Sequence, residues 1–169
     1  MGTYALTGGA SGIGAALLNS LSEQGHSVIN VDIKDADIIA DLSTVDGRQQ
    51  AIAGITERAP DGLDGFVPVA GLAAASAPPH LITSVNYFGT VELVEGLRPL
   101  LEKKGGGIVL LSSNSAPMQV GGEELIDTLL SGDEQASLEV TARIAEGTHY
   151  MLTKRAVTFW MQQIGRAHV

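Results

Sequence analysis

Tyr150 and Lys154 stand four residues apart in a stretch, from His149 to Gln163, that has the pattern of a helix. At this spacing two side chains leave the same face of a helix, so an ammonium group can lie beside a phenol. Phenols ionise only at about pH 10, but a neighbouring cation stabilises the phenolate and brings proton transfer into range. The pair could therefore move a proton, although the same spacing is also common on ordinary exposed helix edges.

A glycine-rich stretch, TGGASGIG from Thr7 to Gly14, follows a short apolar run and precedes a helical pattern. The amino terminus of a helix offers unpaired N–H groups and a partial positive charge, and glycines allow a pyrophosphate to approach the backbone closely. This context predicts a dinucleotide site, with an ordinary strand-to-helix turn as the alternative. The residues expected at the nucleotide are Gly8, Ser11, Gly12, Ile13 and Gly14.

Asp32 ends the next predicted strand, where a carboxylate can accept both hydroxyls of an adenosine ribose and repel a 2′-phosphate. It predicts NAD rather than NADP as the cofactor. Lys34 argues for NADP, whereas the lack of a basic residue at position 11 argues for NAD. Without the glycine loop, Asp32 would read as a solvated strand end or a helix cap.

Apolar runs alternate with helix-period stretches, which predicts an α/β fold: a Rossmann-like, doubly wound parallel sheet. Residues 115–148 are acidic and helix-patterned, and we expect a helical insertion there before the last helix. One face of it would carry Leu125, Ile126, Leu129 and Leu130, and another Leu138, Ala142 and Ala145. The expected strands are 3–6, 27–32, 38–40, 65–70 and 108–111, and the expected helices are 13–24, 45–58, 81–101 and 149–163.

Composition excludes several function classes. The net charge is −9 over 169 residues, which argues against nucleic acid and anionic membrane surfaces as partners. No segment reaches transmembrane length, and the absence of cysteine fits a reducing compartment, so a cytoplasmic location is expected. The four histidines lack metal-ligand spacing and are predicted to be surface or loop residues, with no metal site. They are His26, His80, His149 and His168.

Further motifs follow in a fixed order: Asp41-Leu42, Ala70-Gly71, Asn86 and Ser112-Ser113, ahead of Tyr150 and Lys154. Together with the glycine loop, this order resembles the short-chain dehydrogenase/reductase family over essentially the whole chain. Within the family, it is similar to a bacterial group acting on hydroxysteroids and carbonyl compounds.

The resemblance implies a role for each motif. Tyr150 would be the general acid-base, Lys154 would assist its ionisation and hold the nicotinamide ribose, and Ser113 would polarise the substrate carbonyl. Asn86 would complete the tetrad, although it could also be a buried or capping amide. Ser112, Asn114 and Ser115 lie close enough to leave the serine assignment open. At the cofactor, Asp41 would contact the adenine amino group, Leu42 would offer its backbone there, and Ala70 and Gly71 would line a ribose.

The implied function is NAD(H)-dependent interconversion of a secondary alcohol and a ketone, of hydroxysteroid or xenobiotic carbonyl type, in a protein that forms a homo-oligomer when full length. The alternative is a dinucleotide-binding module without turnover. The run from Pro68 to Gly71 departs from the family's usual Asn-Asn-Ala-Gly and puts the local strand order in question.

We also expect the chain to be a single NAD-binding domain, incomplete at its carboxyl end, with five of the family's usual seven strands. Its last six residues, 164–169, match the translation of a common sequencing adapter. On this view the chain itself would be inactive.

Overall fold

The computed structural model describes residues 1–74, 76–118, 121–145 and 147–166. His168 and the end of the predicted adapter segment, 167–169, lie outside the described residues. Two compact units are present. The first, called the sheet unit, comprises Met1–Ala70 and Gly89–Leu110. The second, called the helical unit, comprises Gly71–Phe88 and the described residues from Leu111 onward.

The sheet unit contains a parallel five-stranded sheet in the order β3-β2-β1-β4-β5. Its centre is β1, in which Ala5 lies opposite Ile29 of β2 and Phe66 of β4. The strands are β1 (Thr3–Thr7), β2 (Ser27–Asp32), β3 (Ile38–Ile39), β4 (Gly65–Pro68) and β5 (Gly107–Ile108). The predicted doubly wound fold is confirmed.

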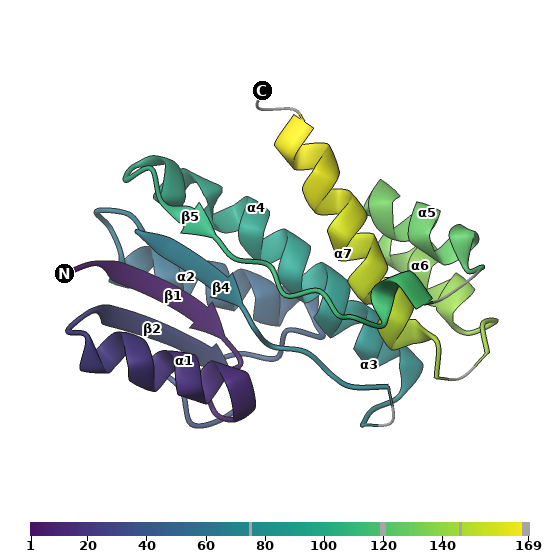
Figure 1. The fold of residues 1–169 in the computed structure, drawn as a ribbon, viewed down its shortest axis with the longest axis horizontal. Coiled ribbons are helices and arrows are strands. Elements are labelled where there is room, and N and C mark those ends of the chain that lie inside the picture. The colour runs from purple at the N-terminus through teal and green to yellow at the C-terminus, as the bar shows by residue number, and fades with distance from the viewer. Residues whose placement is uncertain (75, 119–120, 146, 167–169) are drawn as a thin grey trace. The chain divides into compact units, whose positions relative to one another are not determined.

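Three helices cover the two faces of this sheet. Helix α1 (Gly12–Glu23) lies on one face, and α2 (Val45–Arg58) and α4 (Gly89–Glu102) lie on the other (Figure 1). Because both faces are covered, the central strands are apolar runs rather than alternating patterns. Their buried side chains include Ala5, Leu6, Ile29, Val31 and Phe66.

The run after β4 keeps its place in the sheet despite its unusual sequence. Thr7 of β1 lies opposite Pro68, the Val69 N–H donates to the Thr7 carbonyl at 3.2 Å, and the Ala70 N–H donates to the Thr7 hydroxyl at 3.1 Å. Pro68 has no backbone N–H to donate to β1, but Val69 and Ala70 donate theirs to Thr7. The local strand order is therefore that of the expected fold.

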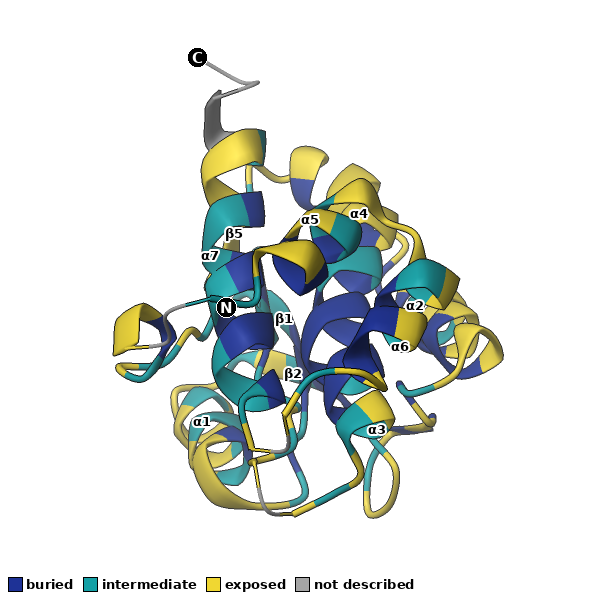
Figure 2. Ribbon diagram, turned by 90° about the vertical axis from the view of Figure 1, so that its right-hand side faces the viewer, coloured by how far each residue is buried: buried dark blue, intermediate teal, exposed yellow. Residues whose placement is uncertain are grey.

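The helical unit is built from short helices and the long α7. In Figure 2, buried residues recur along α7 between intermediate and exposed ones, as expected for a helix with one packed face. The helices are α3 (Pro79–Thr83), α5 (Glu123–Ser131), α6 (Glu134–Thr141) and α7 (His149–Arg166), with a 3₁₀ turn at Ala116–Met118. No helix in the described part of the chain is both long and apolar enough to cross a membrane.

Three local predictions were wrong. The single helix expected over 81–101 is divided into α3, a π-helical turn at Ser84–Phe88, and α4. The last strand is Gly107–Ile108 rather than 108–111: Ile108 lies opposite Phe66 of β4, the Val109 N–H donates to the Phe66 carbonyl at 3.2 Å, and the Ile108 and Val109 side chains are exposed at the sheet edge. In the 115–148 segment, α6 buries Ser137, Val140 and Thr141 instead of the expected alanine face, since α6 ends before Ala142.

Candidate functional site

The glycine loop of the sheet unit is shaped by close backbone approaches. Gly8 has a φ of +80°, and a Cβ there would lie 2.7 Å from the Ala70 nitrogen. A Cβ on Gly14 would collide with the Gly8 carbonyl oxygen. Gly12, with a φ of +54°, instead faces open space, because nothing lies within 4 Å of its Cβ position. Gly8 thus lets the loop lie against the residues after β4, Gly14 lets it close on itself, and Gly12 leaves its outer side open to a ligand.

The amino terminus of α1 points its first N–H groups out of the loop. The helix's own bonding begins with the Ala15 N–H, which donates to the Ser11 carbonyl at 3.1 Å. The N–H groups of Gly12, Ile13 and Gly14 come before this bond, and the Ser11 side chain makes no capping bond. Such donors, together with the helix dipole, fit a phosphate group. Ile13 is 68% exposed beside them.

Asp32 lies half-buried at the carboxyl end of β2, next to this loop. Its Oδ2 accepts from the Ala10 N–H at 3.0 Å and its Oδ1 from the Ile33 N–H at 2.7 Å. These two bonds fix the carboxylate while leaving lone pairs on both oxygens for further donors. The chemistry suits ribose hydroxyls. Lys34, which the sequence raised as a competing signal, is exposed.

Asn30 is a loop-positioning residue that sequence reasoning missed. It is 3% exposed, and its Oδ1 accepts from the Gly9 N–H at 3.0 Å. A Cβ on Gly9 would collide with this amide, so the glycine and the asparagine fit each other. The available signal was a polar residue within an otherwise apolar strand.

The expected adenine residues lie in the turn between β3 and α2. Asp41 Oδ1 accepts from the Ser43 N–H at 2.9 Å and the Ser43 hydroxyl at 2.7 Å, while the Leu42 side chain is buried. Ala70 also belongs to the sheet unit, whereas Gly71 begins the helical unit.

Arg48 is a second buried polar residue that the sequence analysis did not single out. It is fully buried in α2, on the same face as Ala51 and Ile55, and pairs with Glu92 of α4. The available signal was its position on the helix: Arg48 lies three residues before Ala51 and seven before Ile55, which places it on the apolar face.

All four predicted catalytic residues lie in the helical unit. Tyr150 and Lys154 occupy successive turns of α7, as the spacing predicted. Lys154 is 7% exposed, its Nζ donates to the Leu111 carbonyl at 3.0 Å, and burial lowers its pKa. In the described chain no hydrogen bond joins the Tyr150 hydroxyl to Lys154 or Ser113.

The serines that the sequence could not tell apart have different partners. The Ser112 hydroxyl bonds to the Thr158 hydroxyl at 2.9 Å and donates to the Lys154 carbonyl at 3.2 Å, so it is committed to α7. The Ser113 hydroxyl lies 2.9 Å from that of Ser115 and accepts from the Ser115 N–H. Ser113 thus remains attached only to its own turn.

Asn86 sits in the π-helical turn and is completely buried. Its Oδ1 accepts from the Leu72 N–H at 2.7 Å and its Nδ2 donates to the Leu72 carbonyl at 3.0 Å. The amide therefore ties down the segment that follows β4. π-Helical turns often occur at functional sites.

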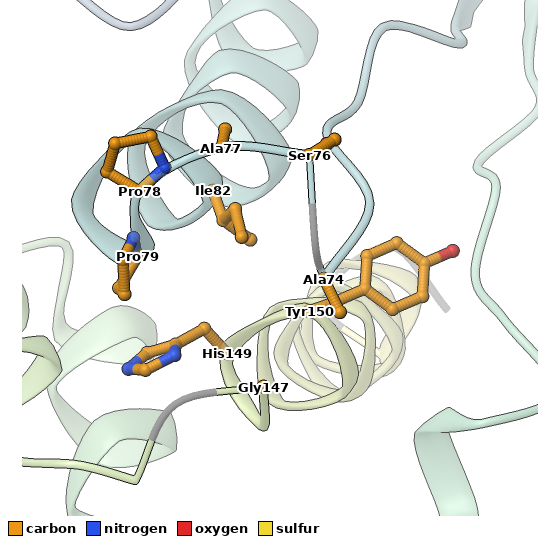
Figure 3. A pocket seen from close by; sticks show the side chains of 9 residues that line it. All are labelled: Ala74, Ser76, Ala77, Pro78, Pro79, Ile82, Gly147, His149 and Tyr150. Carbon is orange, nitrogen blue, oxygen red and sulfur yellow. The ribbon is translucent and has the colours of Figure 1, made fainter.

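A cavity of about 450 Å³ lies between the starts of α3 and α7 within the helical unit. Its walls include Pro78, Pro79, Ile82, His149 and Tyr150. Figure 3 shows the Tyr150 ring at one wall, with the hydroxyl oxygen directed away from the His149 ring. The cavity thus has both apolar and polar walls, since Ser76 and His149 join the prolines and Ile82, and it is bordered by the predicted proton donor.

His149 corrects the prediction that the histidines are surface or loop residues. It is 1% exposed, and its Nε2 lies 3.0 Å from the Thr141 carbonyl at the end of α6. The last carbonyls of a helix lack partners within it, which explains why a buried imidazole is useful there. Among the described residues, no group of three or more His, Asp or Glu side chains could hold a metal ion.

Comparisons with known proteins identify relatives of the chain. No family model matches the sequence. The chain is 36% identical over 163 residues to a 3-alpha-hydroxysteroid dehydrogenase/carbonyl reductase from Comamonas testosteroni, covering 94% of this chain and 63% of that protein. It is 37% identical over 114 residues to a coniferyl-alcohol dehydrogenase from a Pseudomonas strain, covering 64% of this chain and 42% of that protein.

Solved structures give the same picture. A 3-alpha-hydroxysteroid dehydrogenase from Pseudomonas sp. B-0831, complexed with NADH, matches with a TM-score of 0.89 and 38% identity, over 92% of this chain and 63% of that one. A Brucella ovis oxidoreductase of the short chain dehydrogenase/reductase family matches with a TM-score of 0.71 over 96% of this chain and 75% of that one, and at 22% identity supports the fold alone. The chain spans just under two thirds of the length of its hydroxysteroid dehydrogenase relatives.

Proposed function

Because the chain is related by sequence and fold to the short-chain dehydrogenase/reductases, we propose that it binds NAD(H) and carries the catalytic residues of a secondary alcohol/ketone oxidoreductase. The observation that carries this proposal is the Asp32 carboxylate, which is fixed by the Ala10 N–H beside an open glycine loop. The relatives whose names include hydroxysteroids and carbonyl reduction suggest the substrate class.

When bound, the nicotinamide ring would accept a hydride in the oxidised cofactor and donate one in the reduced cofactor. In the sheet unit, the first N–H groups of α1 would bind the pyrophosphate, with the Ser11 hydroxyl beside them. Asp32 would accept hydrogen bonds from the adenosine ribose and repel a 2′-phosphate. Asp41 and Leu42 would face the adenine, and Ala70 and Gly71 a ribose. The open side of Gly12 and the uncapped helix start support this assignment.

In the helical unit, Tyr150 would exchange the proton of the substrate hydroxyl. The Lys154 ammonium would stabilise the phenolate form of Tyr150, and its bond to the Leu111 carbonyl would hold it close to the segment that leads to Ser113. The Ser113 hydroxyl can rotate from Ser115 to a substrate carbonyl because the two residues share only a short turn. Asn86 would act through the backbone of Leu72.

The substrate would be a small ketone or alcohol, of hydroxysteroid or xenobiotic carbonyl type. Two prolines and Ile82 give the cavity next to Tyr150 an apolar part, and Ser76 and His149 give it a polar part, which suits a small molecule that carries both kinds of group. The proposal includes a cytoplasmic location, a homo-oligomer, and no nucleic acid or membrane partner; the net charge of −9 supports the absence of polyanionic partners.

Cofactor titration tests the proposal. We expect NADH to bind at least about tenfold more tightly than NADPH, measured by the fluorescence of the reduced nicotinamide. Asp32→Asn should remove most of this preference, since it removes the negative charge. Asp35→Asn is the control, because Asp35 is exposed and has a left-handed backbone conformation that asparagine tolerates. Equal binding of NADPH by the parent chain would refute the role of Asp32.

A second candidate function is dinucleotide binding without turnover. The Ser113–Ser115 bond and the Lys154–Leu111 bond favour it, because both polar groups already have protein partners. Tight NADH binding without NADH oxidation, across a panel of ketones that includes a 3-ketosteroid, would support this candidate over the oxidoreductase.

A further inference from the structure

We propose that Arg48 is a positioning residue that holds the β3–α2 turn, Asp41 to Thr44, in the shape that receives the adenine end of the nucleotide. This inference rests on the proposed function. Arg48 itself would touch no part of the nucleotide and would act through the backbone of Leu42.

Arg48 is anchored from both sides inside the sheet unit. Its side chain is 0% exposed, its Nε donates to Glu92 Oε2 at 2.7 Å, and its Nη1 donates to the Leu42 carbonyl at 3.2 Å. A buried guanidinium is tolerated only when its charge is paired and its N–H groups find acceptors. Glu92 supplies the charge, and the turn supplies an acceptor.

The other bonds of the turn are local to it and to the start of α2. The Thr44 hydroxyl donates to the Asp41 carbonyl at 3.1 Å and accepts from the Gly47 N–H at 3.0 Å. A Cβ on Gly47 would collide with the Asp41 carbonyl, so the first turn of α2 packs directly on this backbone. These bonds fix the Asp41 carbonyl, and the Leu42 carbonyl accepts from Arg48.

Arg48 holds the peptide that joins Leu42 to Ser43. The carbonyl of this peptide accepts from the guanidinium at 3.2 Å, and its N–H, which belongs to Ser43, donates to Asp41 Oδ1 at 2.9 Å. A carboxylate oxygen can accept from the exocyclic amino group of adenine, and the same peptide thus orients the Asp41 carboxylate. Losing the Arg48 bond would let this peptide rotate and misplace the carboxylate.

The variant Arg48→Lys separates the bond to the Leu42 carbonyl from the ion pair with Glu92. Lysine keeps the ion pair with Glu92 but is a point charge and lacks the guanidinium fork that reaches two acceptors. We expect about tenfold weaker NADH binding, whereas reduced nicotinamide mononucleotide, which lacks the adenosine, should bind within about twofold of the parent chain. Glu92→Gln is the matched control, since it weakens the ion pair but keeps the bond to Leu42, and it should leave NADH affinity nearly unchanged.

The double variant Arg48→Met with Glu92→Met guards against misfolding of the lysine variant, because replacing a buried ion pair by apolar residues often preserves stability. It should show the same selective loss of NADH affinity. Equal losses for NADH and the mononucleotide, or equal effects of Arg48→Lys and Glu92→Gln, would overturn the proposal.

Amide hydrogen exchange of residues 41–44 provides a readout independent of the nucleotide. It should accelerate in Arg48→Lys and stay at the parent rate in Glu92→Gln. Unchanged exchange in Arg48→Lys overturns the positioning role even if NADH binds. Faster exchange in a chain that fails to bind NADH supports the positioning of the turn and refutes the proposed function instead.

Discussion

The sheet unit and the helical unit hold their candidate residues by different means. In the sheet unit, the site is mostly backbone: glycines that permit close approaches, N–H groups at a helix start, and one carboxylate held by two amides. In the helical unit, the site consists of four side chains, and the polar atoms of three of them are bonded to the protein's own backbone or to another side chain. Asn86 is bonded to Leu72, Lys154 to Leu111 and Ser113 to Ser115.

Because the two sets of residues lie in different units, substitutions should be able to alter nucleotide binding and proton transfer separately. A backbone cradle depends on residues that must be small, so substitutions there affect folding and binding together. A side-chain site can lose one hydroxyl with little effect on the surrounding packing.

The largest effect is expected for Tyr150→Phe. In the proposed function Tyr150 donates the proton, so this variant should lower the kcat for ketone reduction by about 10²–10⁴-fold while leaving the NADH dissociation constant within about twofold. Lys154→Ala should damage both, because its ammonium would serve the phenol and the nicotinamide ribose. Tyr4→Phe, on β1 of the sheet unit, is the control and should change neither. Substantial turnover by Tyr150→Phe would remove Tyr150 from the acid-base role.

The next effect concerns the glycine loop. Gly14→Ala should abolish NADH binding and lower the free energy of unfolding by about 3 kcal/mol, because its Cβ would collide with the Gly8 carbonyl. Gly25→Ala has a comparable backbone strain at a φ of +79° but open space around it, and should cost about 1 kcal/mol without altering NADH affinity. Urea unfolding and NADH titration measure both. If Gly14→Ala bound NADH normally, the backbone cradle would not be the nucleotide site.

The smallest effect tests the sheet unit alone, through Asp64. Its Oδ2 accepts from the Thr3 N–H at 2.7 Å and from Lys104 at 3.0 Å, and these bonds lower the pKa of the carboxyl below its usual 3.8. A carboxyl whose pKa is lower in the folded state stabilises the fold above the unfolded-state pKa, and this contribution is lost as the pH falls through the folded-state pKa.

Asp64→Asn should therefore destabilise the protein at neutral pH but little at pH values below its folded-state pKa. The urea midpoint at several pH values is the measurement, and Asp61→Asn, at an exposed position of the same loop, is the control. A constant difference between parent and Asp64→Asn at every pH would contradict the assignment.

The sequence by itself determined most of the elements and the order of the motifs. The strand at Ser27–Asp32, the start of α7 at His149 and the spacing of Tyr150 and Lys154 follow from periodicities of a few residues, which local conformation enforces. The glycine loop was equally predictable, because a tight turn before a helix restricts residue type wherever it occurs.

Only the tertiary structure decided which partner each buried polar group has. Arg48 and its partner Glu92 are 44 residues apart in the sequence, and Ser112 and its partner Thr158 are 46 apart. His149 bonds to the carbonyl of Thr141, at the end of a different helix. Such pairings depend on how elements pack and not on local propensity. Burial then makes them necessary, because a polar group removed from water must find a partner in whatever segment the fold brings to it.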